Sequence, residues 1–348
     1  MATMPGKDIA APSISAAGTV QIVGDQANGC VILDTQAGTV RQFDTRLNQL
    51  GAPRMLPKLT QATGGPAPAH ADGQSNLIGH GTAPALRQGI AGNAATGVVY
   101  FIGNQMAYLA DVGNPMSRWK TVHDLPFNPG TNILGISGDL ANGIVVHNGE
   151  LLALAPDVRA SPAWQSNAVT TGLPILAISG DCNNGVVVYW DVSQALTDDE
   201  GGKTVLPSTY QYAGRIQGAC VPMQEPPVNI DLLVGNGTCG YVALGENQLY
   251  GFDQAQGWTR KASLRFAPTG LTGNPKDGVL ALVGTDNFIV STTDFIAWTL
   301  LQSATPVIPP PSPGSSGAAH QMLADGASDP PEGACSHHAA QTPITTEP

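Results

Sequence analysis

Short apolar runs separated by polar turns recur along the chain from residue 20 to residue 303. Five of them read GVVYFI, GIVVHN, GVVVYW, GYVALG and GVLALV, and other short apolar runs precede them, as in TNILGISGD and VNIDLLVGN. These runs are rich in β-branched residues and are too short for helices. The pattern therefore predicts pairs of β-strands in this region, without regular helices.

A turn of fixed pattern lies between the two strands of each pair. It consists of an aliphatic residue, a small residue, Gly, Asp or Asn, three variable residues and a second Gly. Six copies begin at Ile22, Ile90, Ile136, Ile178, Leu233 and Leu271, and all keep the same spacing between their glycines. A repeat of this kind indicates a fold built from copies of one structural unit.

Each copy has the chemistry of a tight hairpin turn. An Asp or Asn side chain accepts hydrogen bonds from backbone amides two residues on, and the closing Gly adopts left-handed backbone angles without steric cost. We therefore predict a structural role in turns for the repeated residues, which are Gly24, Asp25, Gly29, Gly92, Asn93, Gly97, Gly138, Asp139, Gly143, Gly180, Asp181, Gly185, Gly235, Asn236, Gly240, Gly273, Asn274 and Gly278.

A third and a fourth strand are expected after each pair. The third run ends at an aspartate in five units (Asp44, Asp111, Asp157, Asp253 and Asp294), and a tryptophan follows in four (Trp119, Trp164, Trp258 and Trp298). Four strands in roughly 40–45 residues make one β-propeller blade, and a ring gives every blade two neighbours. We predict an all-β fold, a six-bladed β-propeller of four-stranded antiparallel blades over residues 20–303. Its blades start near residues 20, 88, 133, 175, 230 and 269.

Three further segments complete the predicted organisation. Residues 1–19 form an arm of small residues, and residues 53–88 form an insertion between the first two blades. Residues 304–348 are rich in proline and poor in large apolar side chains, so we expect an extended tail there.

The last unit carries a family resemblance. Its sequence VGTDNFIVSTTDFIAWTLLQSATP resembles the Asp-box repeats of sialidase-like propellers, whose turn reads Ser-x-Asp-x-Gly-x-Thr-Trp. Asp294 and Trp298 fit this turn, whereas Phe295 and Ile296 stand where Gly is expected. The resemblance implies the propeller architecture and no activity. The degenerate blades, the composition and the flanking arms also resemble bacteriophage virion proteins associated with the tail, which implies a structural role.

Charge and hydropathy exclude several classes of partner. The net charge is −11, and the nine arginines and six lysines are scattered along the chain, whereas a duplex-binding surface needs a basic stripe. No basic N-terminal region precedes an apolar run, so we expect no signal peptide. No apolar stretch approaches the roughly 20 residues of a membrane helix. We expect no nucleic-acid partner and no membrane span.

Two stretches imitate nucleotide-binding motifs. GNGTCG, from Gly235 to Gly240, satisfies G-x-G-x-x-G, but a strand-like run follows where a nucleotide site needs a helix. TDDEGGKT, from Thr197 to Thr204, ends like a phosphate-binding loop but begins with Thr in place of Gly. We expect an exposed hairpin tip there, with solvated acidic residues, and no bound cofactor.

Cysteines and histidines do not form a recognisable metal site. The cysteines Cys30, Cys182, Cys220, Cys239 and Cys335 contain no C-x-x-C pair, and we expect reduced thiols, with one disulfide pair left open. Cys335, His337 and His338 lack further ligands at zinc-finger spacing. Calcium needs several oxygen ligands, and each repeated turn mostly offers one side chain. We therefore predict no metal site.

The chain also lacks an evident catalytic constellation. The first strands of the blades end in QIVG, GIAG, GISG, AISG, LLVG and GLTG, without a titratable group. The arginines Arg118, Arg159 and Arg260 lie near the tryptophans of outer strands, and the histidines His70, His80, His123 and His147 are expected in loops or at the surface. We expect no catalytic residue and no enzymatic activity. The sequence leaves open a pair of glycosidase carboxylates.

Irregular connections are expected to share one face of the propeller, at residues 53–88, 197–203 and 221–229. Recognition usually lies in such loops. The predicted function is a non-enzymatic structural and interaction protein of a large assembly, a tail-associated virion component in multiple copies that binds neighbouring protein subunits. The alternatives are a surface or secreted glycan-binding propeller, a sialidase-like glycoside hydrolase and a cytoplasmic interaction scaffold. A surface glycan or receptor is a further candidate partner.

Overall fold

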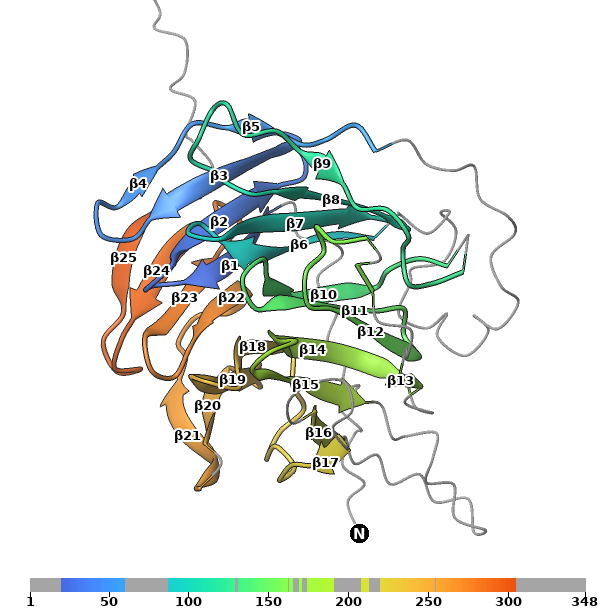
Figure 1. Cartoon of the computed structure of the whole chain (residues 1–348). Coiled ribbons are helices and arrows are strands. Elements are labelled where there is room, and N and C mark those ends of the chain that lie inside the picture. Colours follow the sequence, from blue (N-terminus) through green and yellow to red (C-terminus); the bar gives the residue numbers. More distant parts are fainter. Residues whose placement is uncertain are drawn as a thin grey trace, which may run out of the picture. The chain divides into compact units, whose positions relative to one another are not determined.

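A computed structural model describes residues 20–59, 87–128, 131–161, 163–164, 169–170, 174–190, 208–212, 220–253 and 255–304 of the chain. The predicted arm at residues 1–19, the loop tip at residues 197–203, most of the insertion and the tail after Ala304 lie outside these residues. The described strands are all antiparallel and form six small sheets, each built from strands that are consecutive in sequence (Figure 1).

We number the sheets as blades 1 to 6 in chain order. Blade 1 contains β1 (Val20–Asp25), β2 (Gly29–Asp34), β3 (Thr39–Asp44), β4 (Gln49–Leu50) and β5 (Arg54–Met55). Blade 2 contains β6 (Gln88–Asn93), β7 (Gly97–Ile102), β8 (Gln105–Leu109) and β9 (Lys120–Thr121). Blade 3 contains β10 (Gly135–Asp139), β11 (Gly143–His147), β12 (Leu151–Ala155) and β13 (Val169–Thr170).

The second half of the chain repeats this arrangement. Blade 4 contains β14 (Ile175–Asp181), β15 (Gly185–Trp190), β16 (Ser208–Tyr212) and β17 (Cys220–Pro222). Blade 5 contains β18 (Leu232–Asn236), β19 (Gly240–Gly245), β20 (Gln248–Asp253) and β21 (Gly257–Ser263). Blade 6 contains β22 (Pro268–Asn274), β23 (Gly278–Val283), β24 (Phe288–Thr292) and β25 (Thr299–Ser303).

The first strands of the blades form the inner ring. Each contacts the first strand of the next blade, in the order β1, β6, β10, β14, β18 and β22, and β22 contacts β1 again. The prediction of an all-β propeller made of small antiparallel sheets is therefore confirmed. Because the strands of a blade alternate in direction, the repeated turns and the turns between third and fourth strands lie on one face of the ring. The connections between blades lie on the other face.

The core lies between neighbouring blades. In β11, Ile144 and Val146 pack against blade 2, whereas Val145 packs against blade 4, and all three are fully buried. Successive side chains of a strand point to opposite faces of its sheet, and both faces of this sheet are covered. This explains why the second strands are continuous apolar runs and do not alternate with polar residues. Six such clusters follow one another around the described ring.

The predicted insertion begins too early, because residues 54–55 belong to blade 1. Both β4 and β5 pair with β3, and their registers differ by one residue. Between them the backbone N–H of Gly51 donates to the carbonyl oxygen of Gln42 at 2.8 Å. The two short strands are thus the halves of one outer strand interrupted by a bulge. The predicted ends of three third strands were also late, because β8, β12 and β24 stop before Asp111, Asp157 and Asp294.

Two glycines approach each other closely in every repeated turn. The first glycines have φ between 99° and 117°, and the closing glycines have φ between 75° and 100°. A Cβ atom on any first glycine would come within 3.0 Å of the carbonyl oxygen of its closing glycine. The sequence predicted left-handed angles only for the closing glycine. The structure shows that both positions exclude a side chain, which explains their fixed spacing.

The closing glycines should be sensitive to neighbouring blades as well as to backbone angle. A Cβ atom at Gly143 (φ 90°) would lie 2.8 Å from the carbonyl oxygen of Ala155 and 2.8 Å from Cβ of Cys182 in blade 4. We expect Gly143→Ala to lower the free energy of unfolding by about 2–4 kcal/mol in a denaturant titration.

Gly38 offers a matched control for this substitution. Its φ is 65°, but a Cβ atom there meets nothing within 4 Å. Gly38→Ala should therefore cost only about 1 kcal/mol, from backbone angle alone. Equal decreases in the free energy of unfolding of the two variants would contradict the close packing of turns between blades.

Candidate functional site

A narrow channel on the propeller axis is the first candidate site. It has a volume of about 170 Å³ and is lined by four consecutive residues from the first strand of each of the six blades. These four residues are the aliphatic residue, the small residue, the first Gly and the Asp or Asn of the repeated motif. The repeat found in the sequence is therefore the lining of the channel.

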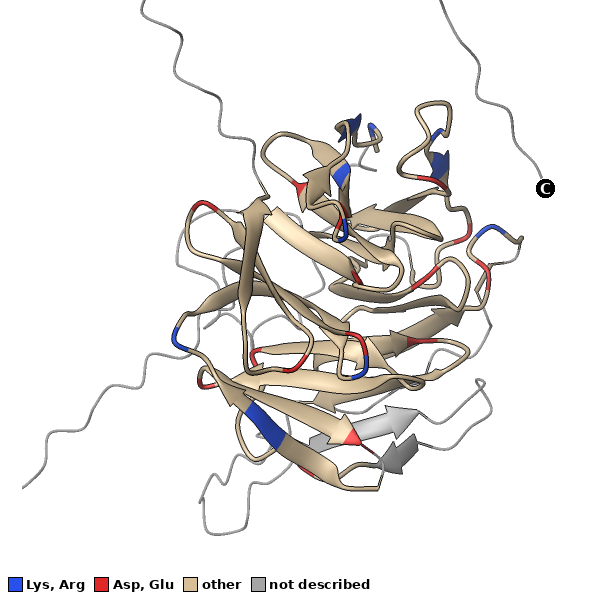
Figure 2. Cartoon of the chain, turned by 90° about the vertical axis from the view of Figure 1, so that its left-hand side faces the viewer, with Lys and Arg blue, Asp and Glu red and all other residues tan. Residues whose placement is uncertain are grey.

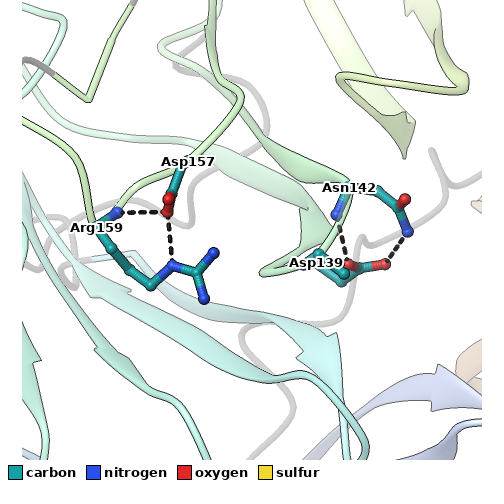
Figure 3. Close-up of polar contacts among 5 residues, drawn as sticks. Asp139, Asn142, Asp157 and Arg159 are labelled. Atoms are coloured by element: carbon teal, nitrogen blue, oxygen red, sulfur yellow. Dashed lines mark hydrogen bonds and ion pairs between the residues drawn. The ribbon is translucent and has the colours of Figure 1, made fainter.

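The six Asp and Asn side chains at the end of this lining cap their own turns. Their Oδ1 atoms accept backbone N–H groups two or three residues later, at 2.6–3.0 Å. In the three turns that begin with Asp, the other carboxylate oxygen accepts the side-chain amide of an Asn at 3.0–3.1 Å, as Asp139 does from Asn142 (Figure 3). Both oxygens of each carboxylate are thus bonded within the turn. Each carboxylate therefore has a structural role in its own hairpin.

Hydroxyl groups in the channel lining connect neighbouring blades. Ser137 Oγ donates to the carbonyl oxygen of Gly180 at 2.7 Å, and Ser179 Oγ donates to that of Gly235 at 2.9 Å. Thr272 Oγ1 donates to the carbonyl oxygen of Gly24 and so bridges blades 6 and 1. In each pair the donor is the small residue of one motif, and the acceptor is the first Gly of the next. These hydroxyls therefore hold the ring together.

Two ionisable groups near the channel, Asp181 and Cys182, have raised pKa values, which favour their neutral forms. Burial raises the pKa of the Asp181 carboxyl, and the nearby Asp139 carboxylate raises it further. Burial also raises the pKa of the Cys182 thiol to about 12, and its Sγ donates to the carbonyl oxygen of Ile144 across the blade interface at 3.1 Å. The thiols of Cys30, Cys182 and Cys239 are free. Cys182 behaves as a small packing residue and not as a nucleophile.

The nucleotide-like stretch GNGTCG is part of a blade interface. The strand β19 follows it, so the helix required by a nucleotide site is replaced by a strand. A Cβ atom at Gly237 would collide with the carbonyl oxygen of Asn184 in blade 4. The middle Gly is therefore required by close packing between two turns, a reason that the motif itself does not reveal.

The arginines named in the sequence belong to three different blades and do not converge on the channel. Arg159 pairs with Asp157 through Nε and Oδ1 at 2.6 Å, on the exposed turn after β12 (Figure 3). Arg260 bonds to Ser263 in its own strand, β21. In the view of Figure 2, lysines and arginines occupy separated positions on the described strands and loops, without a continuous basic stripe.

His147 corrects the expectation of a loop or surface histidine. It ends β11, is 4% exposed, and its Nδ1 accepts the backbone N–H of Gly149 at 3.2 Å. A Cβ atom at Gly135 would collide with the imidazole, so this Gly provides the space for the ring. Burial lowers the pKa of His147 to about 4, and the positive charge of Arg87 contributes. His123 is exposed, and His70 and His80 lie outside the described residues.

A second hollow of about 390 Å³ lies beside the turns of blades 5 and 6. Its polar lining includes Thr238, Asp253, Gln256 and Lys261. Tyr241 also lines it, but this ring is 1% exposed and its hydroxyl donates to the carbonyl oxygen of Gly185 at 3.1 Å. The hollow therefore offers polar groups without an exposed aromatic platform.

The described residues of the chain contain no group of three or more His, Cys, Asp or Glu side chains placed to hold a metal ion. They also include no helix that combines the length and the apolar character needed to cross a bilayer. The cluster of Cys335, His337 and His338 lies outside this part of the chain.

Comparison with known proteins shows the fold alone. No family model and no curated protein matches the chain. Among solved structures, YCF48 bound to D1 peptide is 12% identical, over 82% of this chain and 81% of that one, with a TM-score of 0.44. A streptogramin B lyase is 11% identical over 83% and 84%, with a TM-score of 0.46. Virginiamycin B lyase from Staphylococcus aureus is 12% identical over 84% and 86%, with a TM-score of 0.47.

The hydroxyl between blades 6 and 1 is expected to stabilise ring closure. Thr272→Val keeps the side-chain shape but leaves the carbonyl oxygen of Gly24 without this donor, so it should cost about 1–2 kcal/mol in the free energy of unfolding. Thr272→Ser should retain most of the stability. Thr269→Val is the control, because Thr269 makes only a long bond of 3.4 Å within its own blade. If Thr272→Val and Thr269→Val lower the free energy of unfolding by the same small amount, the Thr272 hydroxyl does not stabilise the contact between blades 6 and 1.

Burial of neutral His147 should make stability fall in mild acid. The folded-state pKa of about 4 lies below the ordinary 6.5, so the unfolded chain takes up the proton first. The contribution of His147 to the free energy of unfolding is fully present above pH 6.5. It decreases by about 3 kcal/mol as the pH falls toward 4. Denaturant titrations over this range should show the loss in the natural protein and a smaller one in His147→Gln. An imidazole that titrates near 6.5 by NMR would contradict this assignment.

Proposed function

We propose that the chain is a non-enzymatic structural and interaction protein of a large assembly. The main support is that polar side chains of the repeated motif, which lines the axis, form hydrogen bonds within their turns or between blades. The carboxylates cap turns, and the hydroxyls of Ser137, Ser179 and Thr272 connect blades. A catalytic propeller needs free acid, base or nucleophilic groups near its axis. A rigid ring whose axial residues make structural hydrogen bonds is suited to a scaffold that binds partners through its outer surfaces.

We also propose that the six sheets are the full set of blades. The proposal is supported by the contact of β22 with β1 and by the apolar cluster that contains Ile22 and Phe43 of blade 1 and Leu280 and Ile289 of blade 6. Gln26 Nε2 adds a bond to the carbonyl oxygen of Thr292 at 3.1 Å. Closure in this arrangement needs no strand shared between the first and last blades.

The assembly is a bacteriophage virion in this proposal, and the chain is associated with its tail. The support is the resemblance of the degenerate Asp-box-like blades and flanking arms to such proteins. The chain would be present in several copies and would bind neighbouring subunits through propeller loops and through residues 1–19 and 304–348. Most of these segments lie outside the described residues.

A glycan-binding propeller is the second candidate function. The observation that favours it is the polar hollow of about 390 Å³ beside Thr238, Asp253, Gln256 and Lys261, which is large enough for a sugar residue. A glycan array probed with the full chain tests this candidate. Binding that disappears in Gln256→Ala and Lys261→Ala, but not in Arg159→Ala, would favour it over the structural role.

The structural role predicts that the full chain is found in particles and has no glycosidase activity. Imaging of particles from the native source, with the chain labelled, should place it at the tail. The full chain should release no product from sialosides or other glycosides. Turnover abolished by substitution of one axial carboxylate, such as Asp181→Asn, would overturn the proposal.

The C-terminal segment provides a more specific test. Deletion of residues 305–348 should leave the far-ultraviolet circular dichroism of the propeller unchanged and should prevent incorporation into particles. The matched control is a chain with the residues of this segment in scrambled order, which should also fail to assemble. Normal incorporation of the deletion variant would contradict the role given to the tail.

A further inference from the structure

Two methionines form an exposed apolar patch on the rim between blades 1 and 2. Met55 is 69% exposed and Met116 is 79% exposed. Arg54, next to Met55, donates to the carbonyl oxygens of Asn114 (2.6 Å) and Ser117, which lie on either side of Met116. This contact joins the strand that carries Met55 to the loop that carries Met116. We call Met55 and Met116, with the exposed cations Lys58, Arg118 and Lys120 beside them in sequence, the methionine patch.

The methionine patch is held by several further contacts. Trp119 Nε1 donates to the carbonyl oxygen of Met55 at 2.8 Å, and the Trp119 ring packs edge-on against Tyr100 with centroids 6.2 Å apart. The exposed methionines therefore lie on a fixed base and not at a free loop tip. Methionine adapts its shape to a partner, and a backbone that is already held in place does not have to be ordered on binding. Both properties favour docking.

A second exposed apolar patch lies on the outer strand of blade 6. Ile296 is 82% exposed and Leu300 is 62% exposed, in β25 and the turn that precedes it. The charged residue of this turn is Asp294, whose Oδ1 accepts the backbone N–H groups of Ile296 and Ala297 at 2.8 and 2.9 Å. We call Ile296 and Leu300, with Asp294, the blade 6 patch.

The turn of the blade 6 patch is backbone-strained. Phe295 has a φ of 62°, which is unfavourable for a bulky side chain, and its ring is 6% exposed in the cluster between blades 5 and 6. Thr292 Oγ1 accepts the backbone N–H of Phe295 at 2.9 Å. Burial of Phe295 thus fixes the turn so that Ile296 points to solvent. Backbone strain of this kind clusters at functional sites, where the surrounding packing maintains it.

The two patches are complementary in charge. The chain as a whole has a net charge of −11, yet the methionine patch contains three of its 15 cationic residues, and the loop of Met116 adds one carboxylate, that of Asp111. The blade 6 patch carries a carboxylate beside its apolar side chains. We propose that the methionine patch of one copy of this chain binds the blade 6 patch of a second copy. Apolar contacts would lie at the centre of the interface and charged pairs at its rim, as in protein interfaces generally.

Because the patches lie on different blades, the contact is heterologous and joins copies head to tail. It deepens the proposed structural role, on which it rests, by naming a partner and two contact surfaces. The net negative charge and the carboxylate in one patch disfavour an anionic membrane as the occupant. Copies joined head to tail form a ring or an open chain, depending on whether the rotation between copies closes.

Sedimentation of the full chain and of paired variants tests this contact. The weight-average mass of the natural protein should rise over about a hundredfold range of concentration and fall again as salt screens the charged rim. Met55→Ser/Met116→Ser should remain monomeric, and Ile296→Ser/Leu300→Ser should also remain monomeric. Leu176→Ser, which changes an exposed residue of blade 4 outside both patches, is the control and should associate like the natural protein. Circular dichroism should show that all variants are folded.

A mixture of the two monomeric variants gives the decisive result. Each retains the patch that the other has lost, so the mixture should form a one-to-one dimer and no larger species. Absence of this dimer would overturn the contact, as would a natural protein that stays monomeric at every concentration. Co-sedimentation with phosphatidylserine vesicles that is lost in Met55→Ser/Met116→Ser would assign the methionine patch to lipid and also overturn it. Each of these outcomes would rule out the contact between copies without ruling out the proposed function, because that function is tested by locating the chain in particles.

Discussion

The close approach of two glycines in each repeated turn is the contact on which the propeller depends. In all six turns, a side chain on the first glycine would collide with the carbonyl oxygen of the second. The same turns pack against those of the next blade, where Gly143 meets Cys182 and Gly237 meets Asn184. A turn without this geometry would separate its own strands and also push the neighbouring blade away from the axis.

The inner strands combine this packing with polar contacts within and between the blades. Carboxylates and amides cap the turns, and three hydroxyls cross from one blade to the next. Burial keeps His147 neutral and raises the pKa of Asp181. These groups stabilise the ring because their hydrogen bonds are satisfied inside it. We propose that recognition takes place instead at exposed apolar side chains on the rim, where Arg54 bonds to the loop of blade 2.

Much of the fold could be predicted from the sequence because the repeat lies in residues with few conformational alternatives. Gly-Asp and Gly-Asn followed by a second Gly indicate a hairpin, and the valine-rich runs after them indicate strands buried on both faces. The short outer strand formed by Arg54 and Met55 was missed because two residues have no periodicity to detect. The burial of His147 was missed because it depends on Gly135, a partner across the hairpin that local sequence does not identify.

The candidate site was harder to predict for a physical reason. The aspartates of the motif cap their turns through short side chains, a local feature, but the left-handed angle of the first glycine follows from its contact with the second. Likewise, Gly237 is small because a carbonyl of blade 4 lies beside it. Such requirements come from neighbouring blades that are about 40–50 residues away in sequence, a typical repeat length in propellers. They become visible only when the ring is assembled.

Native-state hydrogen exchange of the inner strands tests the central claim most directly, namely that the interlocked turns make the ring one cooperative unit. The account predicts that the bonded amides of β1 and β22, at the junction of the first and last blades, exchange with the same free energy of opening as those of β10 and β14. It also predicts that this energy equals that of global unfolding. Exchange of β1 and β22 through a lower-energy opening, while β10 and β14 remain protected, would contradict the claim.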